Sequence, residues 1–146
     1  MIKAVDLRIG DLVIVNENCS LEQGTIGKVS EVRSTPLYKE NEGSIGLKPI
    51  SNDRWPWGVL CRNIDPIPLT PEILEKNGWK KRTEGWYFMM ISKYMYLSVE
   101  FGYENGIRVF LKRTTDGFYV KLNVANNVHE LQHILWALGK DANLKI

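Results

Sequence analysis

The sequence contains one short stretch with the residue types and spacing of a known catalytic motif. It is HELQH, at 129–133, which fits H-E-x-x-H, where two histidines one helical turn apart bind zinc and the glutamate acts as general base. A catalytic zinc ion takes three protein ligands, but His129 and His133 are the only histidines, and Asp141 is the only acid after them. We therefore expect no metal, no cofactor and no catalytic residue here, and keep a zinc hydrolase only as the third alternative.

The helix that carries this motif does not need the two histidines to form. At 100° per residue, Leu131, Ile134, Leu135 and Leu138 fall on one apolar side of a helix over about 127–139. His129, Glu130 and His133 are predicted on the opposite, polar side. The match is then a chance variant of an amphipathic helix.

The rest of the chain offers no other catalytic pattern. It has no G-x-S-x-G, P-loop or G-x-G-x-x-G stretch, and its carboxylates are scattered, so we predict that it is not an enzyme. Its two cysteines, Cys19 and Cys61, form no C-x-x-C pair. With no signal sequence and no apolar run long enough for a membrane span, the sequence predicts a cytoplasmic protein with reduced thiols and no membrane partner.

Strand signals dominate the first half of the chain. Apolar and β-branched runs at 11–15, 25–33, 44–50 and 57–64 are separated by turn residues. In 10–32, GD-x-V-x-V followed by G-x-x-G-x-V-x-x-V resembles KOW and other SH3-like barrels. The resemblance implies a small barrel over residues 1–66, with loops that contact RNA, DNA or protein.

A loop of this half carries a candidate binding site. Arg54, Trp55 and Trp57 stand together, with Pro56 between the two indole rings. Such rings can stack on bases, or they can cover the end of the barrel as a structural plug. The sequence leaves both interpretations open.

The second half, 67–146, predicts a short helix and a β-meander. Thr70 and Pro71 are typical of a helix start, over 71–77. Strands are expected at 79–82, 86–91, 94–102, 107–113 and 118–124, then the helix over 127–139, and 144–146 could add a strand. The fold class is therefore α+β, mostly antiparallel β, with an SH3-like small barrel followed by a meander packed on a C-terminal helix.

Alternation along these strands separates two faces of the meander. The face predicted to pack on the helix carries Leu97, Val99, Val109, Leu111, Phe118, Val120, Leu122 and Val124. The opposite face carries Tyr94, Tyr96, Arg108, Phe110, Lys112, Tyr119 and Lys121. Mixed aromatic and basic groups are found on sheets that bind single-stranded nucleic acid. They are equally found in protein interfaces, or as cross-strand pairs beneath the short helix 71–77.

Charge is unevenly distributed, although the whole chain carries a formal charge of only +2. Residues 1–66 hold 8 Lys and Arg against 9 Asp and Glu, and residues 67–146 hold 11 against 8. Any basic surface therefore belongs to the second half. The total is too small to indicate a polyanion partner by itself.

Four stretches together resemble a family of small proteins from gut-anaerobe genomes, prophages and conjugative elements. They are LRIGDLV (7–13), IDPIPLTPEILEKNGW (64–79), GWYF (85–88) and VHELQHILWALGK (128–140). Members of that family tend to close on V-H-x-L-Q-x-L-x-x-A-L, which implies that His129 and Gln132 belong to the pattern, whereas Glu130 and His133 do not. The resemblance implies a mobile-element origin but no activity, substrate or cofactor.

Two functions of different kinds follow from these observations. The first is a non-enzymatic protein-interaction or accessory module, because exposed aromatic residues accompany a near-neutral charge. The alternative is a nucleic-acid-binding module that uses the KOW-like barrel or the aromatic and basic sheet face. The sequence leaves the partner and the oligomeric state open.

Overall fold

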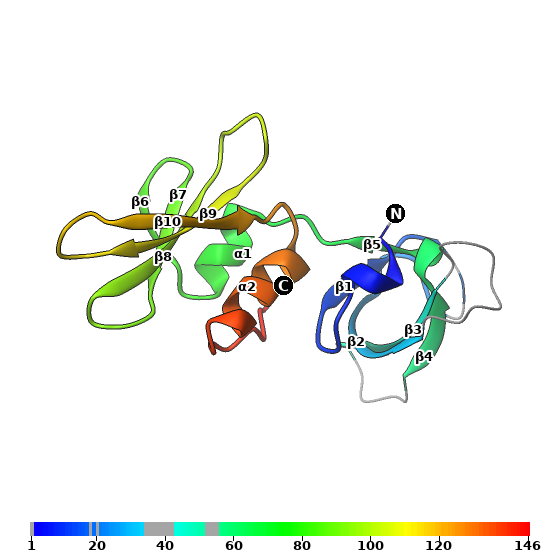
Figure 1. Cartoon of the computed structure of the whole chain (residues 1–146). Coiled ribbons are helices and arrows are strands. Elements are labelled where there is room, and N and C mark those ends of the chain that lie inside the picture. Colours follow the sequence, from blue (N-terminus) through cyan, green and yellow to red (C-terminus); the bar gives the residue numbers. More distant parts are fainter. Residues whose placement is uncertain (1, 18, 20, 34–42, 52–55) are drawn as a thin grey trace. The chain divides into compact units, whose positions relative to one another are not determined.

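The computed structural model describes residues 2–17, 19, 21–33, 43–51 and 56–146. The chain divides into two compact units, Met1–Ile67 and Pro68–Ile146. Each unit contains one five-stranded sheet in which every neighbouring pair is antiparallel (Figure 1). The prediction of an α+β chain dominated by antiparallel strands is confirmed.

The first unit is a sheet curled around its own core. Its strands are β1 (Leu12–Val15), β2 (Ile26–Arg33), β3 (Ser44–Pro49), β4 (Trp57–Leu60) and β5 (Ile64–Pro66), in the spatial order β4-β3-β2-β1-β5. Short 3-10 helices at Ala4–Asp6 and Cys61–Asn63 precede β1 and β5. The buried core includes Val13, Val29, Ile45, Leu47 and Ile64.

Gly27 allows β2 to pack closely against β3. A Cβ atom on Gly27 would stand 2.6 Å from Leu47 Cγ, inside the core, so this position is restricted to glycine. The sheet itself does not close, because β4 and β5 are its two edges and each pairs with only one strand in the described part of the chain. A closed SH3-like barrel is therefore not shown.

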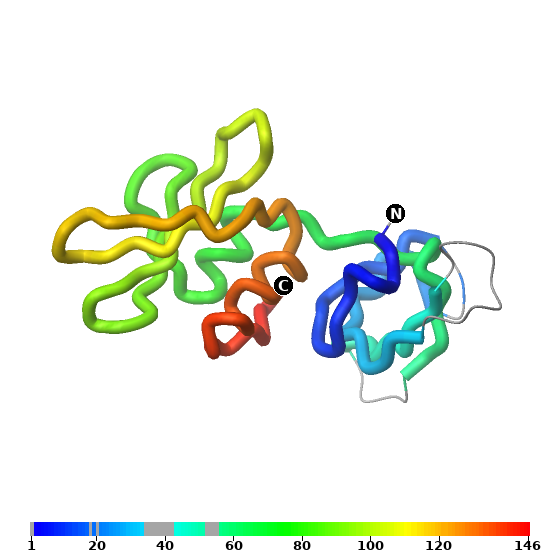
Figure 2. Tube along the Cα trace, in the orientation of Figure 1, coloured from blue at the N-terminus to red at the C-terminus, as the bar shows by residue number. Residues whose placement is uncertain are grey.

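The second unit is a β-meander with two helices. Its elements are α1 (Pro71–Lys76), β6 (Lys80–Thr83), β7 (Trp86–Met90), β8 (Met95–Glu100), β9 (Arg108–Arg113), β10 (Tyr119–Val124) and α2 (Val128–Ala137). The strands lie in chain order, β10-β9-β8-β7-β6, so the trace runs through successive hairpins without a crossover (Figure 2). The predicted meander is confirmed.

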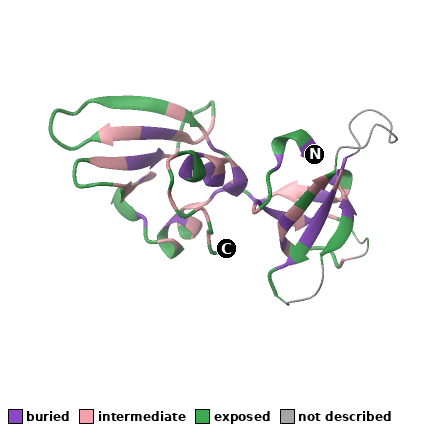
Figure 3. Ribbon diagram, turned by 60° about the horizontal axis from the view of Figure 1, so that its bottom comes forward, coloured by how far each residue is buried: buried purple, intermediate pink, exposed green. Residues whose placement is uncertain are grey.

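The two helices of this unit cover the same face of its sheet. Tyr87 of β7 donates a hydrogen bond from its hydroxyl to Glu75 Oε1 of α1, at 3.1 Å. The face to which Tyr87 belongs continues through Leu97, Val99 and Val109, which are almost fully buried. Buried helix residues supply the other half of this core: Leu74, Val128, Leu131 and Leu135 (Figure 3). Because α1 lies on this side, it does not cover the aromatic and basic face.

Local signals position α1 and the chain end beside it. The Thr70 hydroxyl oxygen accepts a hydrogen bond from the Ile73 N–H, and Pro71 begins the helix. The side-chain amide of Asn77 then pairs with the backbone of Lys145 through two hydrogen bonds of 2.8 Å. Residues 144–146 are therefore held by the Asn77 side chain and do not add a strand to the sheet.

Strand β10 departs from the regular alternation that the sequence predicts. An extra residue between Lys121 and Asn123 shifts its register against β9, which is a β-bulge. Beyond the bulge Val124 pairs with Arg108 and lies on the face opposite to the predicted one. Val120 keeps its predicted side but is 44% exposed, because β10 is an edge strand.

Candidate interaction surface

The structure gathers most of the predicted aromatic and basic residues on one face of the second sheet. Tyr96, Lys112 and Tyr119 form one cross-strand row, Phe110 and Lys121 belong to the next, and Arg108 lies in the row after that. Tyr94 is exposed in the bend before β8 and stands outside these rows. We call this face the open face because neither helix of the unit covers it.

Further residues, outside the set named as candidates from the sequence, belong to this surface. Trp86, Phe88 and Met90 of β7 and Ser98 of β8 extend the same rows, and Tyr103 reaches it from the turn after β8. Alternation along WYFMM at 86–90 predicts a strand, but both faces of this strand are apolar. Its two faces therefore cannot be told apart until β7 is paired with β8. The open face thus comprises Trp86, Phe88, Met90, Tyr96, Ser98, Glu100, Tyr103, Arg108, Phe110, Lys112, Tyr119 and Lys121.

A directed chain of hydrogen bonds organises the centre of the open face. The Trp86 indole N–H donates to the Ser98 hydroxyl, which donates to Glu100 Oε1 at 3.1 Å. Lys112 Nζ donates to the same carboxylate oxygen at 2.5 Å, and the Tyr103 hydroxyl donates to Glu100 Oε2 at 3.0 Å. Because an indole can only donate and a carboxylate can only accept, the direction of this chain is fixed.

Glu100 is the acceptor on which this arrangement depends. Partial burial of its carboxylate favours the neutral form, but the hydrogen bonds and charge of Lys112, with Tyr103 and Ser98, outweigh that cost. The pKa of Glu100 is therefore held below its usual value. The same contact raises the pKa of Tyr103, because its hydroxyl donates to a charged oxygen.

Cations on the open face are held against aromatic rings. Lys112 Nζ lies 4.4 Å from the centroid of a Trp86 ring and 5.0 Å from that of Phe110. The Arg108 guanidinium lies 3.7 Å from the centroid of Tyr103. Such cation–π contacts and the ion pair hold these side chains in defined positions.

The aromatic rings also contact one another across strands. Phe88 meets Tyr96 edge to face at 6.0 Å, and Phe110 meets Tyr119 in the same way at 5.9 Å. Ser98 is fully buried beneath these larger groups, whereas Met90 and Tyr119 are 51% and 62% exposed. The open face therefore has an ordered polar centre and an accessible apolar margin.

Three of the four polar residues in the HELQH stretch have a structural role. Glu130 caps the start of α2, where its Oε2 accepts the Asn127 N–H at 2.9 Å. Gln132 is buried, and its Nε2 donates to the Ala142 carbonyl at 2.8 Å. His129 is buried too, at 6% exposure, so its predicted place on the polar side is wrong. Residue 129 lies beside the apolar stripe of a helix that packs over a wide arc.

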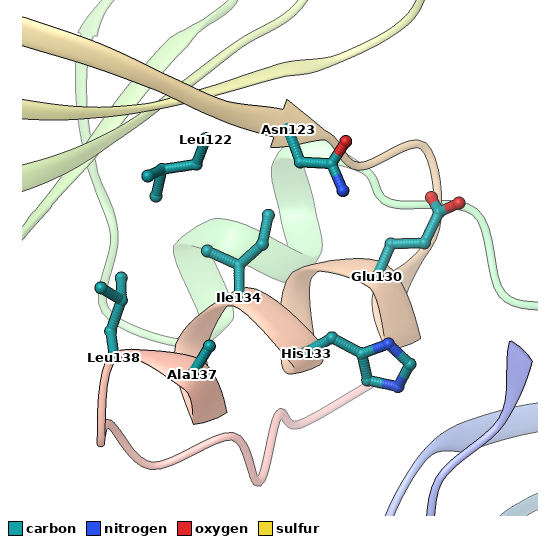
Figure 4. Close-up of a pocket in the computed structure, with 7 residues that line it drawn as sticks. All are labelled: Leu122, Asn123, Glu130, His133, Ile134, Ala137 and Leu138. Atoms are coloured by element: carbon teal, nitrogen blue, oxygen red, sulfur yellow. The ribbon is translucent and has the colours of Figure 1, made fainter.

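A groove separates α2 from the edge strand β10 (Figure 4). It has a volume of about 320 Å³, an apolar floor from Leu122, Ile134 and Leu138, and His133 and Glu130 along its rim. The carboxylate of Glu130 caps the helix, so this rim does not present a free base beside His133. In the described residues, no group of three or more His, Cys, Asp or Glu side chains could hold a metal ion.

Candidate residues of the first unit are only partly described. Trp57 begins β4 and is 40% exposed, while Arg54 and Trp55 lie outside the described residues. Cys19 is exposed and Cys61 is buried, both as free thiols. Burial raises the pKa of the Cys61 thiol, which makes it a poor nucleophile.

Comparison with known proteins adds no further constraint. No family model, curated protein or solved structure matches this chain. Among the described residues, no helix is both long and apolar enough to cross a membrane.

Proposed function

We propose that the chain is a non-catalytic protein-interaction module that binds its partner through the open face of the second sheet. The observation that carries this proposal is the directed chain from Trp86 through Ser98 to Glu100, closed by Lys112. It orders large aromatic groups on a face that neither helix of the unit covers. Rigid aromatic groups beside a satisfied polar centre are typical of residues that dominate protein interfaces.

The charge balance of the open face favours a protein over a nucleic acid. Of the cations on this side of the sheet, Lys112 is paired with Glu100, whereas Arg108 and Arg82 are stacked on Tyr103 and Trp86. Two exposed cations remain on the edge strands of this side, Lys121 of β10 and Lys80 of β6, which pairs with Phe88. Binding to a phosphate backbone takes several cations that can release counterions, and the carboxylate at the centre of the face opposes it.

Nucleic-acid binding is the second candidate, supported by the accessible rings of Tyr96 and Tyr119. Titration against fluorescent single- and double-stranded DNA and RNA, at low and physiological salt, separates the two functions. We expect no binding at physiological salt. Micromolar binding that weakens steeply as salt rises, and that is lost in Tyr96→Ala, would replace the protein-interaction proposal.

Protein binding is tested by comparing variants on opposite sides of the unit. Met90→Ala with Tyr96→Ala alters the accessible margin of the open face, whereas Trp136→Ala removes a ring that is 63% exposed on α2. We expect the wild type and Trp136→Ala to retain the same protein from extracts of the native cells, and the double variant to lose it. If the wild type and both variants retained the same protein, the open face would not be its binding surface.

We also propose that the first unit is an SH3-like barrel and serves as the scaffold of a second contact surface. The support is its strand order, with β1 between β2 and β5, and the 3-10 helix between β4 and β5. The exposed ring of Trp57 lies at one end of this sheet. Mobile-element origin stays a prediction from the sequence resemblance.

A further inference from the structure

The two edges of the second sheet differ in how they meet solvent. One edge is β6, where Lys80, Lys81 and Arg82 are all exposed. A run of charged side chains protects an edge strand from pairing with another chain. The other edge is β10, where Phe118, Tyr119 and Val120 are 55%, 62% and 44% exposed. Residues 118–120 of this edge are apolar or aromatic, so no charged side chain among them prevents pairing with another strand.

The backbone of β10 is open to a further strand over a short stretch. The Phe118 carbonyl accepts the Arg113 N–H, and the Ala125 N–H donates to the Ile107 carbonyl, each at 2.8 Å. Bonding direction alternates along an antiparallel strand, so Val120 also faces β9 while Tyr119 and Lys121 turn their N–H and C=O groups outward. Beyond the bulge, the Val124 N–H is taken by the side chain of Asn123 at 2.9 Å, which limits the open edge to residues 119–121.

We infer that this edge pairs with β10 of a second copy of the chain, antiparallel and centred on Val120, to form one ten-stranded sheet across a two-fold axis. In this register Tyr119 faces Lys121 of the second copy in two hydrogen-bonded pairs, and the two Val120 residues face each other. The Tyr119 ring of each copy then lies beside the Lys121 ammonium of the other copy, and no two like charges face each other. A register centred on Lys121 would instead place two lysines against each other.

The same register fills the groove beside α2. The two-fold axis stands perpendicular to the sheet, so the helices of both copies lie on one side of it. Phe118 projects toward that side, as Val120 does, and in the second copy it falls opposite Leu122. Leu122, Ile134 and Leu138 form the apolar floor of the groove of about 320 Å³. An apolar cavity of about 150 Å³ accommodates a benzene ring, so the groove has room for the phenylalanine. The same surface of each copy thus supplies both the strand edge and the groove that the other copy needs. A two-fold interface requires this self-complementarity.

This inference is independent of the proposed function, because it uses the β10 edge and not the centre of the open face. The first test is the mass of the full-length chain by sedimentation equilibrium across the micromolar range. We expect a dimer whose dissociation constant rises by about tenfold or more in Tyr119→Lys, which sets lysine against Lys121 of the second copy. Tyr119→Glu places an opposite charge there and should dissociate no more readily than the wild type. Met90→Lys, which adds the same charge to a distant strand, should leave the dimer unchanged.

A cross-link tests the register directly. Facing residues of a non-hydrogen-bonded antiparallel pair have Cα atoms about 4.5 Å apart, within the range of a disulfide. In a Cys19→Ser background, Val120→Cys should form a covalent dimer under mild oxidation, and Met90→Cys should not. A single-chain mass at every concentration would overturn the inference. So would equal dissociation of the two Tyr119 variants, or cross-linking of Val120→Cys no faster than that of Met90→Cys.

Discussion

The two faces of the second sheet are built from neighbouring residues of the same strands, but they are stabilised differently. On the face covered by α1 and α2, Leu97, Val99 and Val109 are completely buried among apolar groups. On the open face, a hydrogen-bonded network joins an indole, a hydroxyl, a carboxylate and an ammonium, those of Trp86, Ser98, Glu100 and Lys112. Burial holds the first face together, whereas hydrogen bonds and ring contacts order the second. A surface ordered without a covering layer can bind a partner with little loss of side-chain entropy.

The largest expected difference is between adjacent residues of β8. Leu97→Ala should lower the free energy of unfolding by about 2–5 kcal/mol, because it opens a cavity in a fully buried site. Tyr96→Ala should cost only about 1 kcal/mol, since its side chain is only partly buried and its ring meets Phe88 edge to face. Urea denaturation of both variants measures the contrast. Equal losses would mean that the open face is also a structural core.

The ion pair at the centre of the open face should contribute less than that core. Lys112→Met leaves Glu100 without its charged partner in a site where both side chains are less than one-fifth exposed. We expect a loss of about 1–3 kcal/mol in the free energy of unfolding. Lys121→Met, at an exposed position on the same face, is the control and should change stability by less than about 0.5 kcal/mol.

Acid should weaken the open face before it affects the covered one. Because folding lowers the pKa of Glu100, its stabilising effect is complete above the usual glutamate pKa of about 4.3 and is lost as the pH falls through the lower folded value. The free energy of unfolding of the wild type should therefore decrease more steeply in acid than that of Glu100→Gln. Parallel curves for the two proteins would show that Glu100 contributes no charge-dependent stability.

The smallest expected effect concerns His133, at the rim of the groove. His133→Ala should change the midpoint of thermal unfolding little, and zinc should not raise that midpoint in the wild type. His129→Ala should lower it, because residue 129 is buried against the core. A stabilisation by stoichiometric zinc that both histidine variants abolish would restore the metal-site interpretation.

Alternation in the sequence was enough to separate the two faces at β8 and β9. Leu97, Val99 and Val109 lie inside as predicted, because period-two patterns survive in strands with neighbours on both sides. The pattern failed in β10, where one extra residue turns Val124 to the opposite face. A bulge depends on local backbone geometry that the side-chain pattern of KLNV (121–124) does not reveal.

The candidate surface was predictable only in part for a related reason. Regular alternation along the strands was enough to identify Tyr96, Arg108, Phe110 and Lys112 as residues of one face. Trp86 and Tyr103 were missed because their membership depends on the pairing of β7 with β8 and on a turn that brings the Tyr103 hydroxyl to Glu100. The burial of His129 was missed because the amphipathic pattern alone indicates one narrow stripe, whereas α2 buries Val128, His129 and Gln132 as well.

Site-specific photo-crosslinking in the native cells tests whether the open face is the binding surface. A photoreactive phenylalanine analogue at position 96 reports on the open face, and the same group at position 136 reports on an exposed helix position of the same unit. We expect a discrete adduct with another protein from position 96, and none of that mass from position 136. Adducts of the same mass from both positions, or none from position 96, would contradict the claim that the open face is the binding surface.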